Sequence, residues 1–399
     1  MTSRLPVATR RLLASRLIVS IGQGAMAVDF ALYARALHWP ASFLGATVGA
    51  GILLNGLLTA AAGPLSDRWG RKPFLLAYQV IAAVAGIVAT LSASRWVLAA
   101  ITALAGYGRG AVGAPALFGA VEQSWLAGTV PSGQLGRVFA RNAATGFLGT
   151  AIGAFIAGLP RLWQGWLPGA LAYRPLFALC ALVAVVAFIL LAGTEDVKPP
   201  RREESTEQAG TAASENRLLV GLAGVNALNG LGIGLTGPLL TWWFAARYGV
   251  GAALIGPAMG ATLLLAGAAS LLAGRIGART GLVRVIVAMR GTGLVLLLLM
   301  PFAPSFALAM LAYAGRTVVN RGTAGPRQAL ILGAVRGHRR GLAASVSSFS
   351  TQLPRALGPW IAGLFFGAGL FTVPFLLAAG FQAAYLVFYR RLFVGRDLR

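Results

Sequence analysis

Acidic residues are scarce in this chain. Only 10 of its 399 residues are Asp or Glu, against 34 Lys and Arg, and there are two histidines and one cysteine, Cys180. A single cysteine forms neither an intrachain disulfide nor a cysteine-based metal site. The two histidines are far apart in the sequence, and the chain has no glycine-rich phosphate loop of the ATP-hydrolysing kind. We therefore expect no metal, no cofactor and no enzymatic centre.

Charged residues of either sign are also few. They make up 11% of the chain, whereas 57% is apolar, which excludes an ordinary soluble domain. About 20 apolar residues cross the roughly 30 Å of bilayer hydrocarbon as a helix. The sequence thus predicts an all-α integral membrane protein with twelve transmembrane helices. We expect them over residues 11–37, 42–65, 73–93, 96–119, 136–159, 173–193, 217–246, 251–273, 282–301, 305–326, 342–368 and 371–389.

The formal net charge of +24 suggests nucleic-acid binding, but the positions of the charges contradict this. With the N-terminus placed in the cytoplasm, 24 of the 34 Lys and Arg fall in segments on that side and five on the other. Such a bias predicts the orientation of membrane helices. We expect a multi-pass protein of the bacterial inner membrane with both termini cytoplasmic, in contact with lipid and not with nucleic acid.

The chain reads as two related halves. Residues 194–216 hold six of the ten acids and form the one sustained polar segment, which we interpret as a cytoplasmic linker. It separates an N-terminal six-helix bundle (1–193) from a C-terminal one (217–399). Gly108-Arg109 corresponds to Gly315-Arg316, and similar correspondences recur at nearly the same offset. Parallel repeats of this kind predict two pseudo-symmetric bundles around an axis along the membrane normal.

A charged motif follows the second apolar run. It reads Gly63-Pro64-Leu65-Ser66-Asp67-Arg68-Trp69-Gly70-Arg71-Lys72, and a weakened copy occurs at 270–279. This motif, Arg109-Gly110-x-x-Gly113 and Gly358-Pro359…Gly363 resemble those of the major facilitator superfamily, and the similarity extends over essentially the whole chain. Length and span number are most similar to the drug:proton antiporter group. The resemblance implies a monomeric secondary transporter that exports small amphipathic molecules against protons by alternating access.

The lone acids are the candidate residues for coupling and gating. Asp29 lies inside the first span with no basic residue nearby, so burial favours its neutral form and makes it a candidate proton carrier. The resemblance implies that Arg109 is its electrostatic partner and that Asp67 latches the two halves together. Glu122, at the end of the fourth span, is either a second proton site or an interfacial ion pair. The expected gate comprises Gly63, Asp67, Arg68, Gly70, Arg71 and Lys72.

Polar and aromatic side chains inside other spans predict the walls of a substrate cavity. They are Phe30, Tyr33, Asn55, Asn226, Asn229, Arg316, Asn320, Thr351 and Arg355. The arginines support an alternative to drug export, because the C-terminal spans contain no acid and arginine binds carboxylate and phosphate groups well. This alternative is a transporter of organic anions or phosphorylated metabolites.

Overall fold

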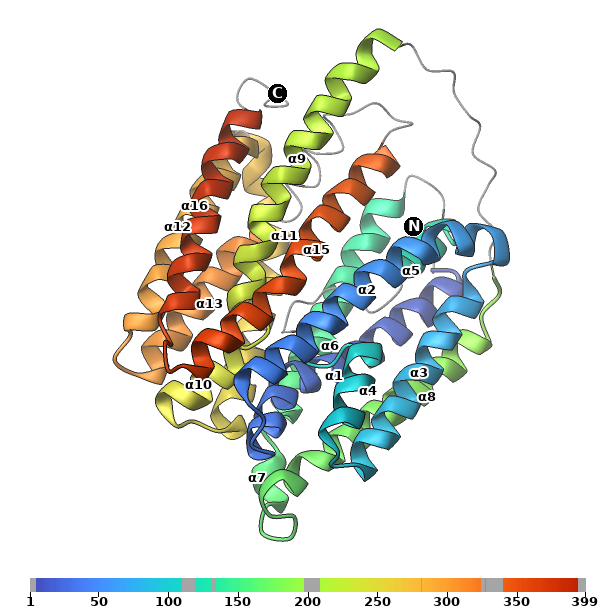
Figure 1. Ribbon diagram of the computed structural model, residues 1–399. Coiled ribbons are helices and arrows are strands. Elements are labelled where there is room, and N and C mark those ends of the chain that lie inside the picture. The colour runs from blue at the N-terminus through green and yellow to red at the C-terminus, as the bar shows by residue number, and fades with distance from the viewer. Residues whose placement is uncertain are drawn as a thin grey trace.

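The computed structural model describes residues 5–109, 119–130, 134–196, 209–280, 282–323, 327 and 340–393. These residues form helices arranged in two bundles that stand side by side (Figure 1). The first bundle contains α1 (Val7–Ala36), α2 (Ala41–Trp69), α3 (Lys72–Leu91), α4 (Arg95–Ala105), α5 (Gly119–Gly128), α6 (Leu135–Ile156), α7 (Pro160–Trp163), η2 (Gly169–Tyr173) and α8 (Arg174–Ala192). The second contains α9 (Ala209–Thr236), α10 (Leu240–Tyr248), α11 (Ala252–Thr280), α12 (Leu282–Leu299), η3 (Met300–Phe302), α13 (Phe306–Gly322), α15 (Arg340–Gly367) and α16 (Val373–Phe393).

The predicted membrane fold is confirmed. In the described part of the chain, nine helical segments are long and apolar enough to cross a membrane. Each of the twelve predicted spans coincides with one helix or with a consecutive pair, α4 with α5 and α9 with α10. Large apolar side chains such as Leu182 and Ile189 on α8 are more than half exposed, as expected for a helix that faces lipid.

Three local predictions were wrong. The fourth span is not one continuous helix, because Gly106 and Gly108 adopt φ angles of 77° and 71° and α4 ends at Ala105. The charged motif is not mainly a turn, since α2 continues to Trp69. Helix α9 begins at Ala209, inside the segment expected to be an unstructured linker, of which 197–208 lies outside the described residues.

The two bundles contact each other closely at one end. Helix α2 packs along α15, and α6 packs along α11. At the first contact a Cβ on Gly45 would lie 2.1 Å from the carbonyl oxygen of Pro359, and one on Gly363 would lie 2.3 Å from that of Ala41. Backbones approach this closely only where there is no side chain. Glycine at these positions therefore lets the bundles close against each other.

At the opposite end the bundles diverge. In Figure 1 the upper ends of α9 and α15 lean away from those of α2 and α3, whereas α2 and α15 lie together lower in the view. Helix α1 begins and α16 ends toward this divergent end, where α2 also turns into α3. The molecule is thus closed at one end and open at the end that carries the charged motif.

Candidate functional site

A cavity of about 920 Å³, part of it open solvent, lies inside the first bundle and is bounded by α15 of the second. Its walls come from α1, α2, α3, the segment after α4, α8 and α15. The polar lining residues are Gln23, Asn55, Tyr78, Gln79, Tyr107, Arg109, Thr150, Gln352 and Arg355. Apolar side chains, among them Val19, Met26, Ile52 and Val183, complete the wall. The cavity is therefore an apolar pocket with a few polar groups, as is usual for small-molecule sites.

Arg109 is held by the end of α4. Its Nε donates a hydrogen bond to the carbonyl oxygen of Gly106 at 2.7 Å, and its Nη2 donates to that of Ala105 at 3.1 Å. The last carbonyls of a helix lack intrahelical donors and carry a partial negative charge. The guanidinium therefore caps α4, and the helix break after Ala105 fixes it at the cavity wall.

Arg355 reaches the same place from the second bundle. This side chain on α15 is 7% exposed, and its Nη2 donates to the carbonyl oxygen of Arg109 at 2.9 Å. Its Nη1 donates to Oε1 of Gln352 at 3.2 Å. The contact between Arg355 and Arg109 joins the two halves at the cavity and brings two guanidinium groups close together.

Neither arginine meets a carboxylate. No Asp or Glu is among the described residues that line the cavity, and the printed hydrogen bonds of Arg109 and Arg355 go to neutral oxygens. The predicted cavity residue Asn55 accepts a hydrogen bond from Thr59 at 3.3 Å, and its Nδ2 has no partner among the described residues. Two positive charges, spare amide groups and apolar walls together form an environment suited to an anion.

Asp29 lies outside this cavity. It is fully buried on α1, one turn beyond the lining residue Met26, and neither carboxylate oxygen has a hydrogen-bond partner among the described residues. It lies near Cys180 and Tyr173, and no ion pair to Arg109 forms within the described part of the chain. The structure thus retains Asp29 as an isolated buried carboxyl but does not bring it together with its predicted partner.

Phe30 and Tyr33 are part of an aromatic cluster and do not line the cavity. The ring of Phe30 packs against Tyr107 at 6.4 Å between centroids, and that of Tyr33 against Phe177 at 5.1 Å. Both predicted residues are at most 1% exposed. The cluster fills the first bundle around Asp29 and keeps the neighbourhood of the carboxyl apolar.

The gating motif is anchored within the first bundle. The Arg71 Nη1 donates to the carbonyl oxygen of Ser124 on α5 at 2.6 Å, and the Lys72 Nζ donates to that of Ala192 on α8 at 2.6 Å. The backbone N–H groups of Arg71 and Lys72 donate to the Asp196 carboxylate at 3.1 and 3.3 Å. This carboxylate lies at the N-terminus of α3, where the free N–H groups and the helix dipole favour an anion.

The sequence did not point to Asp196, which it placed in a polar linker. The motif residues Gly63 and Asp67 lie on α2 and Gly70 follows it, while Arg68 is exposed. The side chain of Asp67 lies outside the described residues, so its predicted role as a latch stays a prediction.

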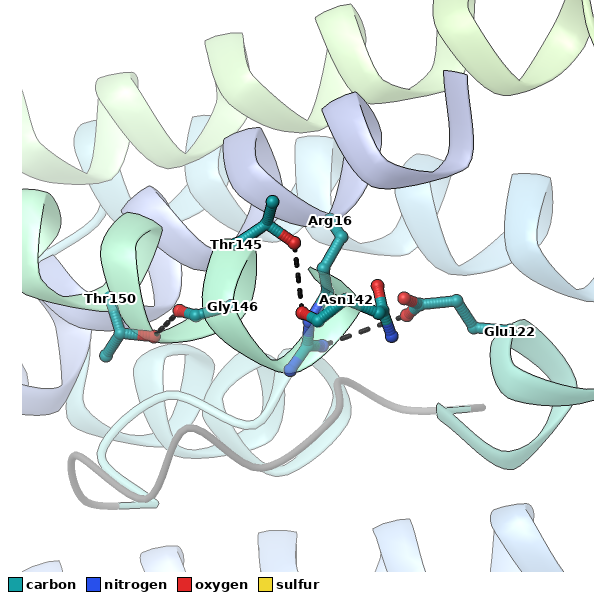
Figure 2. Close-up of polar contacts among 6 residues, drawn as sticks. All are labelled: Arg16, Glu122, Asn142, Thr145, Gly146 and Thr150. Carbon is teal, nitrogen blue, oxygen red and sulfur yellow. Dashed lines mark hydrogen bonds and ion pairs between the residues drawn. The ribbon is translucent and has the colours of Figure 1, made fainter. Parts of the chain in front are cut away.

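Glu122 forms an ion pair with α1. One of its carboxylate oxygens lies 3.8 Å from Nη1 of Arg16, and the two side chains are 14% and 5% exposed. Figure 2 shows Asn142 of α6 beside this pair, with Thr145 donating to the Asn142 carbonyl oxygen. The pair connects α1, α5 and α6 toward the open end of the molecule.

The predicted residues of the second bundle form a separate polar group. Asn226 accepts a hydrogen bond from Arg327, and Asn229 accepts one from Arg290 at 3.4 Å. Arg316 and Asn320 lie on α13, and Thr351 on α15 donates to a carbonyl of its own helix; none of the three lines the cavity described above. Arg290 also donates to Thr323 Oγ1 at 3.0 Å.

Comparison with known proteins agrees with this architecture. The sequence profile of the Major Facilitator Superfamily matches residues 12–227. Over 100 residues, the chain is 35% identical to multidrug resistance protein D of Escherichia coli (strain K12), an alignment that spans 24% of this chain and 25% of that protein.

Solved structures of transporters share the fold at low sequence identity. The nucleoside transporter NupG superimposes with a TM-score of 0.77 at 12% identity, over 97% of this chain and 100% of that one. A bacterial homologue of the human lysosomal transporter Spinster, inward-facing and occupied, gives 0.76 at 13% identity over 98% of each chain. The inward-open xylose transporter XylE of E. coli gives 0.72 at 13% over 96% of each. With its duplicated helical bundles, its loop motif and this profile match, the chain belongs to the major facilitator superfamily of membrane transporters.

Proposed function

We propose that this transporter moves small amphipathic organic anions across the bacterial inner membrane. The observation that carries the proposal is the pair Arg109 and Arg355, which line one cavity with no carboxylate among its described residues. Buried charges without counter-charges are costly, so a cavity of this kind favours a ligand that supplies the missing negative charge. Apolar lining residues such as Met26 and Ile52 suit the hydrocarbon part of the same molecule.

Alternating access follows from the way the bundles meet. They close on each other at the Gly45 and Gly363 contacts and diverge at the end that carries the charged motif. Together with the positive-inside bias, which makes the divergent end cytoplasmic, this supports an inward-facing state loaded from the cytoplasm. Export is then the direction that the similarity to a multidrug resistance protein supports. We expect a monomer to suffice, because both halves of the cavity come from one chain.

Protons are the proposed driving ion. Asp29 is a fully buried carboxyl without hydrogen-bond partners in the described structure, next to the inner end of the cavity. Such a group is held in its neutral form until water or a cation reaches it. A change of state that opens the closed end would hydrate Asp29 and release its proton, which links proton movement to the rocking of the bundles.

A second candidate is proton-coupled export of cationic drugs. The 35% identity to multidrug resistance protein D and the isolated carboxyl of Asp29 favour it. It requires Asp29 to attract the substrate directly, although the aromatic cluster containing Phe30 and Tyr33 surrounds this carboxyl in the inward-facing state.

Transport into vesicles separates the two candidates. The purified protein is reconstituted with an imposed pH gradient, and internal pH is followed as aryl carboxylates or lipophilic cations are added. The variants are Arg355→Gln and Asp29→Asn, with Arg284→Gln, an exposed arginine of α12, as the matched control. We expect a response to anions that Arg355→Gln abolishes and Arg284→Gln retains. A response to cations only, unchanged in Arg355→Gln, would refute the anion proposal and support drug export.

A further inference from the structure

The polar group of the second bundle contains two arginines without a counter-charge. Arg290 on α12 and Arg327 after α13 both lie over the ring of Tyr385 on α16, with their guanidinium carbons 5.7 and 6.0 Å from its centroid. Their printed hydrogen bonds go to Asn229, Thr323 and Asn226, all of which are neutral. From residue 217 to residue 393 the sequence contains no Asp or Glu, so no acid of this bundle can balance the pair.

The first bundle shows how the equivalent place is balanced. Gly24 lies against the Thr150 carbonyl oxygen as Gly234 lies against that of Arg355, which puts the two helix pairs in register. Eight residues earlier on these four helices stand Arg16 and Asn142 in the first bundle, and Asn226 and Ser347 in the second.

In the first bundle, Glu122 approaches Arg16 beside Asn142 (Figure 2). In the second, Arg327 approaches Asn226, and Asn226 donates to Ser347 at 3.2 Å. A cation thus occupies the place of the carboxylate, and the balance of charge is reversed.

Unused donors remain in this group. The Nε of Arg327 and the hydroxyl of Tyr385 are buried and have no hydrogen-bond partner among the described residues, and Tyr385 is only 1% exposed. Unsatisfied buried donors of this kind commonly mark an absent ion or water. Two guanidinium groups and a phenol hydroxyl are the donors that bind a phosphate group best.

We propose that the second bundle binds one phosphate group between Arg290 and Arg327, beside the hydroxyl of Tyr385. This site is separate from the cavity of Arg109 and Arg355 and does not depend on the transported substrate. Arg290 lies eight residues from the start of α12 and Tyr385 eight from the end of α16, which is roughly 12 Å from the open end. A soluble phosphate or the headgroup of an anionic lipid can reach that depth.

Two binding measurements on the full-length protein in neutral detergent distinguish these sources. Native mass spectrometry follows retention of phosphatidylglycerol against phosphatidylcholine. Thermal unfolding follows the response to inorganic phosphate against chloride at equal ionic strength. We expect the wild type to bind either phosphatidylglycerol or inorganic phosphate, and whichever one it binds identifies the source.

Variants assign the binding to this group. Arg290→Gln, Arg327→Gln and Tyr385→Phe each remove one donor, and for each arginine we expect roughly tenfold weaker binding or more. Tyr385→Phe keeps the ring and serves if an arginine variant does not fold. Arg284→Gln and Arg355→Gln are the controls and should bind like the wild type. Failure of the wild type to bind either probe, equal binding by all variants, or a loss confined to Arg355→Gln would overturn the proposal.

Discussion

Replacing Gly45 by alanine should shift the transporter toward its outward-facing state. The new Cβ would lie 2.1 Å from the carbonyl oxygen of Pro359, and both α2 and α15 would have to move apart to accept it. Inserting one methyl group into a tight helix contact destabilises it by about 1–3 kcal/mol. Because this contact exists only when the closed end is shut, the whole penalty falls on the inward-facing state.

The size of the shift follows from that penalty. A difference of about 1–3 kcal/mol changes a two-state ratio roughly 5- to 150-fold. If the outward-facing state is a minor one, populated at about 1%, Gly45→Ala would raise it to between a few per cent and about half. Gly56 provides a matched control on the same interface, because a Cβ there would meet only the Gln352 Cβ at 3.9 Å, an ordinary contact distance.

Pulsed electron paramagnetic resonance measures this shift. Spin labels are placed at Arg35 and Ala368, two exposed positions at the closed end, after the buried Cys180 has been replaced by alanine. Gly45→Ala should add a population with a longer distance between the labels, and Gly56→Ala should not. If folded Gly45→Ala gives the wild-type distance distribution, the contact does not hold the closed end and the reasoning is refuted.

Three further predictions concern acidic residues. Asp196→Asn should lower the stability of the first bundle by about 1 kcal/mol, since it weakens the carboxylate that accepts from the N-terminus of α3; thermal unfolding checks this against Glu195→Gln, and equal midpoints would contradict it. Asp29→Asn should abolish proton release while substrate binding persists, and proton release that persists in this variant would exclude Asp29 as the carrier. Glu122→Gln should destabilise the protein more than the double variant with Arg16→Gln, because the single change leaves a buried arginine unpaired; additive losses in a double-mutant cycle would show that the two groups are not coupled.

Much of the fold followed from the sequence because it depends on long-range averages. Apolar runs of about 20 residues predicted the spans, and the offset between the repeated motifs predicted two bundles. Arg109, Asn55 and Arg355 were selected as polar residues within apolar runs, and all three line the cavity. A polar residue in a membrane helix has few places to go other than the protein interior, so this inference is robust.

Depth and partner choice could not be predicted in the same way. Helical periodicity indicates a face, but it does not say which neighbour covers that face or where the cavity ends, and Phe30 and Tyr33 therefore lie in an aromatic core. Asp196 was missed because its partners are backbone groups of Arg71 and Lys72, more than 120 residues earlier. The pair of Arg290 and Arg327 over Tyr385 joins three helices that carry no common motif.

The charge preference of the cavity is the central claim, and equilibrium binding to the purified protein tests it most directly. Isothermal titration would compare an aryl carboxylate with the amide and the amine of the same body, for the wild type and for Arg355→Gln. The account predicts that the carboxylate binds at least about tenfold more tightly than the amide and that Arg355→Gln removes this difference. Tighter binding of the amine, or a carboxylate preference that survives in Arg355→Gln, would contradict it.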